Sequence, residues 1–218
     1  MDEGFGLPSG GFADRTEAGR LLAEALEGLE DDVVVLGIPR GGVPVAAEVA
    51  RARGWSLDVV IPRKIGAPGN PELGLGAIAP GVRVLDERIV ARLGVPQEYL
   101  DREIERQEAE IRRRAEAYRR GRPPASVAGK TAIVVDDGVA TGGTAAAALR
   151  WARAQGAEAV VLAVPVGAPE SIRRLSREAD RVVVLAAPER FYAVGQWYRD
   201  FEQTSDEEVV RLLDEARA

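Results

Sequence analysis

Two adjacent carboxylates, Asp136 and Asp137, stand directly before a short turn rich in glycine and threonine. An ionised carboxylate only accepts hydrogen bonds, so this pair suits hydroxyl donors such as a vicinal diol. The turn leads into a helix-forming run that begins at Ala145, and free backbone N–H groups at a helix N-terminus attract anions. Residues 142–144 can therefore wrap a phosphate group. A diol beside a phosphate describes ribose 5-phosphate, which is the ligand that this segment predicts.

Other phosphate-binding patterns do not fit this turn. It has no lysine, which a Walker A sequence requires, and it lacks the Gly-x-Gly-x-x-Gly fingerprint of dinucleotide sites. A purely structural alternative stays open, in which Asp136 and Asp137 only end a strand and cap the following helix.

A second turn of the same kind occurs earlier in the chain. Residues 33–38 form an apolar run typical of a buried parallel strand, and a helix is expected over 45–53. The residues of the turn between them include Pro39, Arg40, Gly41 and Gly42. The order of strand, glycine turn and helix predicts a second anion site. The alternative is a tight turn with Arg40 in solvent.

The elements that must position these turns alternate along the chain. Further strands are expected at 57–61, directly before Asp136, at 159–165 and at 182–185. Further helices are expected at 13–29, from the central turn to residue 155, at 169–177 and at 205–218. The last helix begins with a Ser205/Glu208 capping box. This alternation predicts an α/β fold with a doubly wound, mostly parallel sheet. Ligands of such sheets bind at the carboxyl ends of the strands, where both glycine turns fall.

The segment 62–72 is predicted to be a mobile loop. It contains three prolines and two glycines, with the cations Arg63 and Lys64 near its start. Glu72 is its only acid, and two uses stay open for it: proton transfer, or stabilisation of the loop.

The remaining segments are predicted to form an insertion and a cap. Residues 73–85 suggest a short hairpin, and 86–121 a highly charged, mostly helical insertion whose polar face is solvated. We expect residues 1–12 and 189–205 to form a hood over the core of about 30–188, within a single domain of 1–218. The hood's aromatic side chains could stack on a planar base or pack the hood onto the sheet.

Composition excludes several classes of chemistry. The 218-residue chain has no cysteine and no histidine, which removes thiol nucleophiles, Ser-His triads and most zinc sites. The net charge of −6 argues against general nucleic-acid binding. Because no apolar run approaches about 18 residues and the first residues lack a basic leader, we expect a cytoplasmic protein with no membrane partner.

The string Val-Val-Asp-Asp-x-x-Ala-Thr-Gly-Gly-Thr over 134–144 resembles the signature of type I phosphoribosyltransferases, closest to the adenine type. The resemblance implies that the two aspartates contact the ribose 2′- and 3′-hydroxyls of 5-phosphoribosyl 1-diphosphate (PRPP). It assigns PRPP binding to Asp136, Asp137, Gly138, Val139, Ala140, Thr141, Gly142, Gly143 and Thr144. Several relatives carry aspartate at the position of Ala140, which counts against hypoxanthine or guanine as the base.

Two further stretches extend the resemblance. The turn 39–42 is similar to the pyrophosphate loop of the family, which often contains a non-proline cis peptide, expected here at Pro39–Arg40 or Arg40–Gly41. Arg63-Lys64 resembles the start of the mobile loop in orotate-type relatives. The string Arg-Lys-Ile-Gly-x-Pro-Gly-Asn-Pro-Glu over 63–72 is also similar to a group of poorly characterised phosphoribosyltransferases.

The resemblance implies transfer of phosphoribose from PRPP to a nitrogenous acceptor, such as a nucleobase, by a homodimer. Pyrophosphate binding is expected at Pro39, Arg40, Gly41, Gly42, Arg63 and Lys64, and catalytic roles at Arg40, Lys64 and Glu72. Mg²⁺ is expected as the cofactor, held by substrate and water and not by a protein-only cage. Two alternatives stay open: a non-catalytic sensor of PRPP or a nucleotide, and an interaction protein that uses the 86–121 helix.

Overall fold

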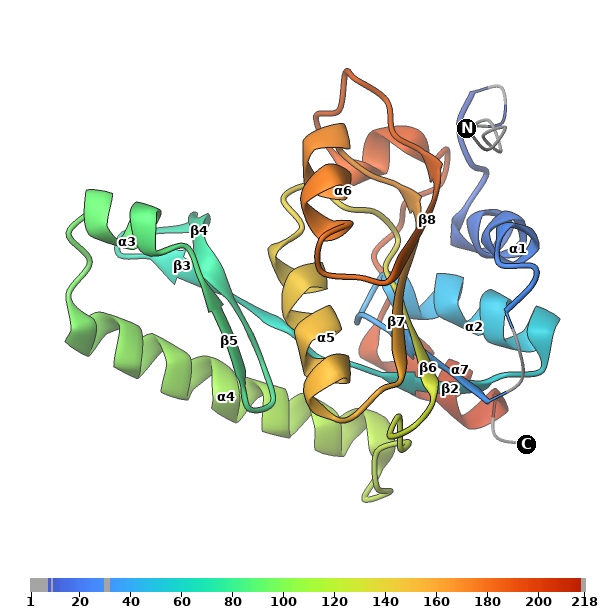
Figure 1. Ribbon diagram of the computed structural model, residues 1–218, viewed down its shortest axis with the longest axis horizontal. Helices are drawn as coiled ribbons and strands as arrows, with labels where there is room; N and C mark the ends of the chain where they lie inside the picture. The colour runs from blue at the N-terminus through green and yellow to red at the C-terminus, as the bar shows by residue number, and fades with distance from the viewer. Residues whose placement is uncertain (1–7, 9, 30–31, 217–218) are drawn as a thin grey trace.

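The computed structural model of the chain describes residues 8, 10–29 and 32–216 (Figure 1). Its centre is a five-stranded parallel sheet with the order β2-β1-β6-β7-β8. The strands are β1 (Val33–Gly37), β2 (Ser56–Val59), β6 (Thr131–Val135), β7 (Ala159–Val166) and β8 (Arg181–Ala186). The chain runs outward from β1 to β2 and then returns past β1 to β6. The predicted α/β fold is therefore confirmed, with its topological switch point between β1 and β6.

Helices cover both faces of this sheet (Figure 1). One side carries α1 (Arg15–Ala25), α2 (Gly42–Arg53) and α7 (Asp206–Glu215), and the other carries α5 (Gly143–Ala154) and α6 (Pro169–Leu175). Side chains of β1 alternate between the two cores: Val33 and Val35 pack on one side, Val34 and Leu36 on the other. Burial on both faces explains why these strands are apolar throughout.

Several predicted bounds differ from the structure at their ends. The helix expected over 13–29 is the shorter α1, because the Asp14 side chain caps its start by accepting a hydrogen bond from Glu17 N. Residues 1–7 and 9 of the predicted hood, and 30–31 of the predicted core, lie outside the described residues. Within the parts of the chain that the structure covers, no helix is both long and apolar enough to span a bilayer.

The prediction of an irregular loop over 62–72 is wrong. A second, antiparallel sheet begins there, with the order β3-β4-β5. Its strands are β3 (Arg63–Ala67), β4 (Asn70–Ala79) and β5 (Val82–Leu85). Pro68 and Gly69 form the turn between β3 and β4. Pro71 lies on the part of β4 that pairs with β3 and not with β5. Proline is tolerated at both places, so these residues are compatible with strand pairing. The hairpin expected over 73–85 is confirmed.

The charged insertion consists of α3 (Glu87–Arg92) and the long α4 (Gln97–Arg119), which runs from the second sheet to α7 (Figure 1). One face of α4 is apolar and buried, at Leu100, Ile104, Ile111 and Tyr118. The C-terminal end of α4 is fixed to the core because Arg119 pairs with the buried Asp58 at 3.1 Å and donates to Val59 O at 2.7 Å.

The two hood segments, one before α1 and one before α7, meet at the edge of the core. Phe12 N donates to Trp197 O and Arg199 N to Phe12 O, both at 2.8 Å, beside the short 3₁₀ helix η1 (Val194–Trp197). The rings of Phe12 and Tyr198 pack with centroids 5.4 Å apart, and both side chains are buried. Of the two uses left open for the hood aromatics, these two rings serve packing.

Candidate functional site

The two predicted turns are in direct contact at the switch point of the sheet. Ile38 N donates to Val135 O at 2.8 Å, which joins the ends of β1 and β6. A Cβ on Gly41 would overlap the Asp137 carboxylate, and one on Gly42 would lie 2.8 Å from the Cα of Asp136. Glycine is therefore required at both positions for the backbone to approach the aspartates. The peptide bond between residues 39 and 40 is cis, as expected for this turn.

This close approach gives a first prediction. Gly41→Ala should lower the free energy of unfolding by about 1–3 kcal/mol, because the new methyl group displaces the Asp137 carboxylate. Urea denaturation measures the change. Gly143→Ala is the matched control, since a Cβ there meets no atom within 4 Å and alanine favours the helix. Equal stability of the two variants would contradict the contact.

The paired carboxylates lie in an environment that disfavours their charge. Asp136 and Asp137 are within hydrogen-bonding reach of each other, and Asp136 Oδ1 accepts from Asp137 N at 2.9 Å. Burial raises the pKa of Asp136 well above its usual value, and the neighbouring charge of Asp137 raises it further. Burial also raises the pKa of Asp137, against the opposing charge of Arg15. A hydrogen-bond donor or a cation placed against the pair would therefore stabilise its charged form.

Arg15 supplies the positive charge at this site. Its Nε lies 2.9 Å from Asp137 Oδ2, and both side chains are mostly buried. The same guanidinium donates to Glu202 O at 2.7 Å and lies 4.0 Å from the ring centroid of Phe201. Tyr198 Oη donates to Asp137 O at 2.5 Å, and burial, then the charge of Asp137, raises the pKa of this phenol, which keeps it a donor. No motif or spacing in the sequence distinguishes Arg15 from the other arginines.

The loop 138–144 reaches solvent at the carboxyl end of β6. Gly142, with φ +71°, is the N-cap residue of α5. No side chain caps α5 in the described structure, so the first N–H groups of the helix are left for a ligand. Ala140 and Thr141 are exposed. A Cβ on Gly138 would lie 2.5 Å from Val194, so glycine lets the hood pack on this loop.

Groups at the end of β7 and in α6 fix the backbone of the loop. Val139 N donates to Val166 O at 2.9 Å, and Ser171 Oγ donates to Ala140 O at 2.6 Å. The guanidinium of Arg174 donates to the carbonyl of Thr141. Sequence reasoning missed Ser171 and Arg174, because nothing in their spacing relates them to the loop.

Arg40 of the turn 39–42 takes part in a group of polar contacts that joins this turn to α7 and α4. Its Nη1 lies 3.8 Å from Asp206 Oδ1, at the first turn of α7. The same oxygen accepts from Tyr118 Oη of α4 at 2.6 Å. Burial, followed by the hydrogen bond to Asp206, raises the pKa of Tyr118 to about 12. The predicted pyrophosphate turn thus has a carboxylate partner that an anionic ligand could replace.

The other predicted catalytic residues lie on the second sheet. Lys64 pairs with Ala77 in the antiparallel register, and its exposed side chain passes over Gly74. Arg63 Nε donates to Gln107 Oε1 of α4 at 2.9 Å, so its described contact is with the insertion and not with either glycine turn. Glu72 lies within β4, and its side chain is outside what the structure describes.

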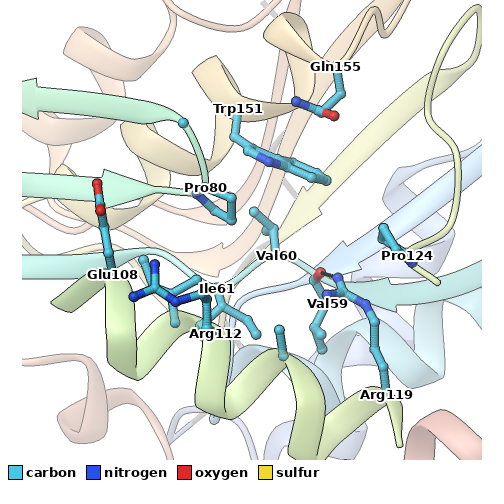
Figure 2. A pocket seen from close by; sticks show the side chains of 13 residues that line it. Val59, Val60, Ile61, Pro80, Glu108, Arg112, Arg119, Pro124, Trp151 and Gln155 are labelled. Carbon is cyan, nitrogen blue, oxygen red and sulfur yellow. Dashed lines mark hydrogen bonds between the residues drawn. The ribbon is translucent and has the colours of Figure 1, made fainter. Parts of the chain in front are cut away.

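A hollow of about 500 Å³ lies elsewhere, between α4, the segment after β2, the β4–β5 turn and the end of α5 (Figure 2). The indole of Trp151 faces it, with Val60 and Pro80 on other walls. No lining residue belongs to 39–42 or 136–144. Its mostly apolar surface has no carboxylate pair and no open helix start for a sugar phosphate, so it is not the predicted site.

The fold and the paired turns agree with the comparisons. Residues 14–198 match the family described as "Phosphoribosyl transferase domain", and the chain belongs to this family. It is similar to the protein TT1426 of Thermus thermophilus, with 51% identity and a TM-score of 0.79, over 94% of this chain and 98% of that one.

The chain is also similar to a curated protein sequence. The Mycobacterium tuberculosis (strain H37Rv) protein named "Putative phosphoribosyl transferase Rv0571c" is 52% identical over 207 residues. The match covers 94% of this chain and 47% of the relative, so this chain spans about half the length of that protein.

Proposed function

We propose that the protein binds PRPP and transfers its 5-phosphoribosyl group to a nitrogenous acceptor with release of pyrophosphate. The observation that supports this most directly is the contact between the two glycine turns and the paired aspartates at the β1/β6 switch point. One turn offers open amides for a phosphate, the carboxylates suit a diol, and the other turn offers Arg40 for a second anion.

In this proposal each part of PRPP has its own partner. The 5′-phosphate lies on the amides of 142–144 and the hydroxyl of Thr144. The ribose hydroxyls donate to Asp136 and Asp137. The pyrophosphate lies against the turn 39–42, where Arg40 exchanges its contact with Asp206 for the ligand.

A magnesium ion fits the charge of this site. The two carboxylates lie within reach of each other, and Arg15 pairs with Asp137. In the described structure Asp136 has no ion-pair partner of its own, so a cation beside it would favour its charged form. Mg²⁺ would supply neutralisation of the pyrophosphate, held mainly by substrate oxygens and water. Asp136 is the protein group placed to orient such water molecules.

The chemistry then needs positioning and charge more than a protein nucleophile. The bond from C1′ to pyrophosphate breaks with its electron pair on the leaving oxygen, and the acceptor nitrogen forms the new bond at C1′. Arg40 is placed to stabilise the leaving group. The aspartates hold the sugar while the bonds exchange.

The test is a pyrophosphate-release screen across purines, pyrimidines and non-nucleobase amines, with PRPP and Mg²⁺ present. We expect one acceptor class to be turned over. The variant Asp136→Asn with Asp137→Asn should weaken PRPP binding at least about tenfold, because charge-assisted hydrogen bonds are lost. Calorimetry that shows unchanged affinity in this variant would defeat the assignment. PRPP binding without turnover of any acceptor would instead favour a sensor.

Lys64 provides a separate prediction about catalysis. Lys64→Ala should reduce turnover more than PRPP affinity, if the lysine neutralises the leaving pyrophosphate as the family resemblance implies. Steady-state kinetics with calorimetry separates the two effects, and Lys130→Ala is the control, since Lys130 pairs with Asp32. Lys64 lies on the regular strand β3. A normal rate in the variant would exclude this lysine from the mechanism.

A further inference from the structure

A second cationic site lies between the start of β3 and the middle of α4. It is a groove of about 320 Å³ lined by Arg63, Arg106, Gln107, Ala109, Glu110 and Arg113. No lining residue comes from the turns 39–42 or 136–144, which hold the proposed PRPP site. We call it the α4 groove.

Arg63 is the central cation of the α4 groove. It is half-buried, and its Nε is fixed by Gln107, whose own Nε2 donates to Glu103 Oε1 at 2.8 Å. Gln107 is 5% exposed, so this arrangement is built into the packing of α4. Among the residues that the structure covers, no carboxylate pairs with Arg63. Burial, followed by the charge of Arg114, lowers the pKa of Arg63, and the charge of Glu110 opposes this shift.

The arginines around it are held in place by carboxylates. Glu103 takes two hydrogen bonds from Arg106, at 2.7 and 2.8 Å, and Glu110 takes two from Arg113, at 2.7 and 2.9 Å. Arg114 also donates to Glu110, at 2.7 Å. Four guanidinium groups thus face two carboxylates, a net local charge of +2 in a chain whose net charge is −6.

The spacing of these cations indicates the size of the ligand. Arg106 and Arg113 are separated by two helical turns, about 10 Å along the axis of α4, and Arg63 faces the segment between them. A single phosphate is too short to meet both. Arg106 and Arg113 use Nε and Nη2 on their carboxylate partners, and in the described structure their Nη1 groups make no hydrogen bond and are left for phosphoryl oxygens. No aromatic side chain lines the α4 groove to stack on a base.

We propose that the α4 groove binds a diphosphate group, through Arg63, Arg106 and Arg113, at the same time as PRPP occupies its own site. Such a group is carried by inorganic pyrophosphate and by nucleoside diphosphates. The groove recognises the phosphoryl chain alone, so both sources bind.

The test is calorimetric titration of inorganic pyrophosphate, and in a second series ADP, into the full-length protein with saturating PRPP and no acceptor. Both are expected to bind with similar affinity. The variant Arg106→Gln with Arg113→Gln should weaken both at least about tenfold. Arg102→Gln with Arg112→Gln is the control, because it removes the same charge from exposed positions of α4 outside the groove and should leave affinity unchanged.

The substituted arginines are 70% and 59% exposed, so the variant is expected to keep its fold, and circular dichroism checks this. Loss of pyrophosphate binding when PRPP is added would overturn the proposal, as would equal weakening in the two double variants. Binding of neither ligand would also overturn it. The comparison of variants does not need PRPP to bind, so failure of the transferase proposal and failure of this one are distinguishable.

Discussion

Asp136→Asn is expected to raise the free energy of unfolding of the ligand-free protein by on the order of 1 kcal/mol, while PRPP binding is lost. The folded state raises the pKa of Asp136 through burial and the charge of Asp137. Ionising this buried carboxyl group therefore opposes folding. Asparagine keeps the shape and accepts the hydrogen bond from Asp137 N without the charge.

The sign of the effect on the wild type follows from the same shift. The pKa of this carboxyl group is near 3.8 in the unfolded chain and higher in the folded protein. The free energy of unfolding therefore falls as the pH rises from the unfolded pKa towards the folded pKa. Urea denaturation across this range should show a decline for the wild type that is smaller for Asp136→Asn.

Asp137→Asn is the comparison for this prediction. It should not stabilise the protein, because it leaves the mostly buried Arg15 without its carboxylate. With PRPP added, the wild type should gain stability and Asp136→Asn should not. A less stable Asp136→Asn variant would show that the carboxylate does not oppose folding.

Arg15→Gln should move the acidic limb of the pH dependence of PRPP affinity to higher pH. In the proposal Asp137 binds the sugar as an acceptor, so affinity is retained above the pKa of this carboxyl and lost below it. Arg15 opposes the rise in that pKa caused by burial. Without the guanidinium the pKa of Asp137 rises further, so the loss of affinity on acidification begins at a higher pH.

The pH profile separates this effect from a merely structural one. Loss of the contacts with Glu202 and Phe201 alone would lower affinity equally at every pH. Arg15→Lys retains the charge and should keep the profile near that of the wild type. Arg20→Gln, an exposed position of α1 that pairs with Glu48, should leave both affinity and profile unchanged. A uniform loss of affinity in Arg15→Gln would contradict the electrostatic role.

The parallel core could be predicted because its signals are local. Apolar runs such as 33–38 and 159–165 are buried on both sides, and glycines after them fit a turn to a helix. The hairpin of the second sheet was predicted, but β3 and the start of β4 were missed for the same reason: the prolines of 62–72 indicate a loop when read locally. Their positions, at a turn and on a stretch of β4 with a single partner strand, are set by the pairing of β3 with β4, which single residues do not encode.

The candidate site could likewise be predicted only where its residues form a local pattern. The residues of 136–144 and 39–42 are marked by type and spacing, and the structure places these two segments in contact. Arg15, Tyr198 and Asp206 reach them from remote parts of the chain through hydrogen bonds and ion pairs. An arginine or aspartate of that kind has no pattern in its neighbourhood, so only the tertiary structure identifies it.

The junction at Phe12 and Tyr198 joins two segments that are far apart in the sequence. Tyr198 and the nearby Arg15 both hold Asp137, whereas the parallel strands pair without them. Local separation of these two segments would therefore remove contacts of the aspartate without breaking any strand pairing. If the ligand binds as proposed, a substitution at this junction is expected to change its affinity from a position remote from the sugar.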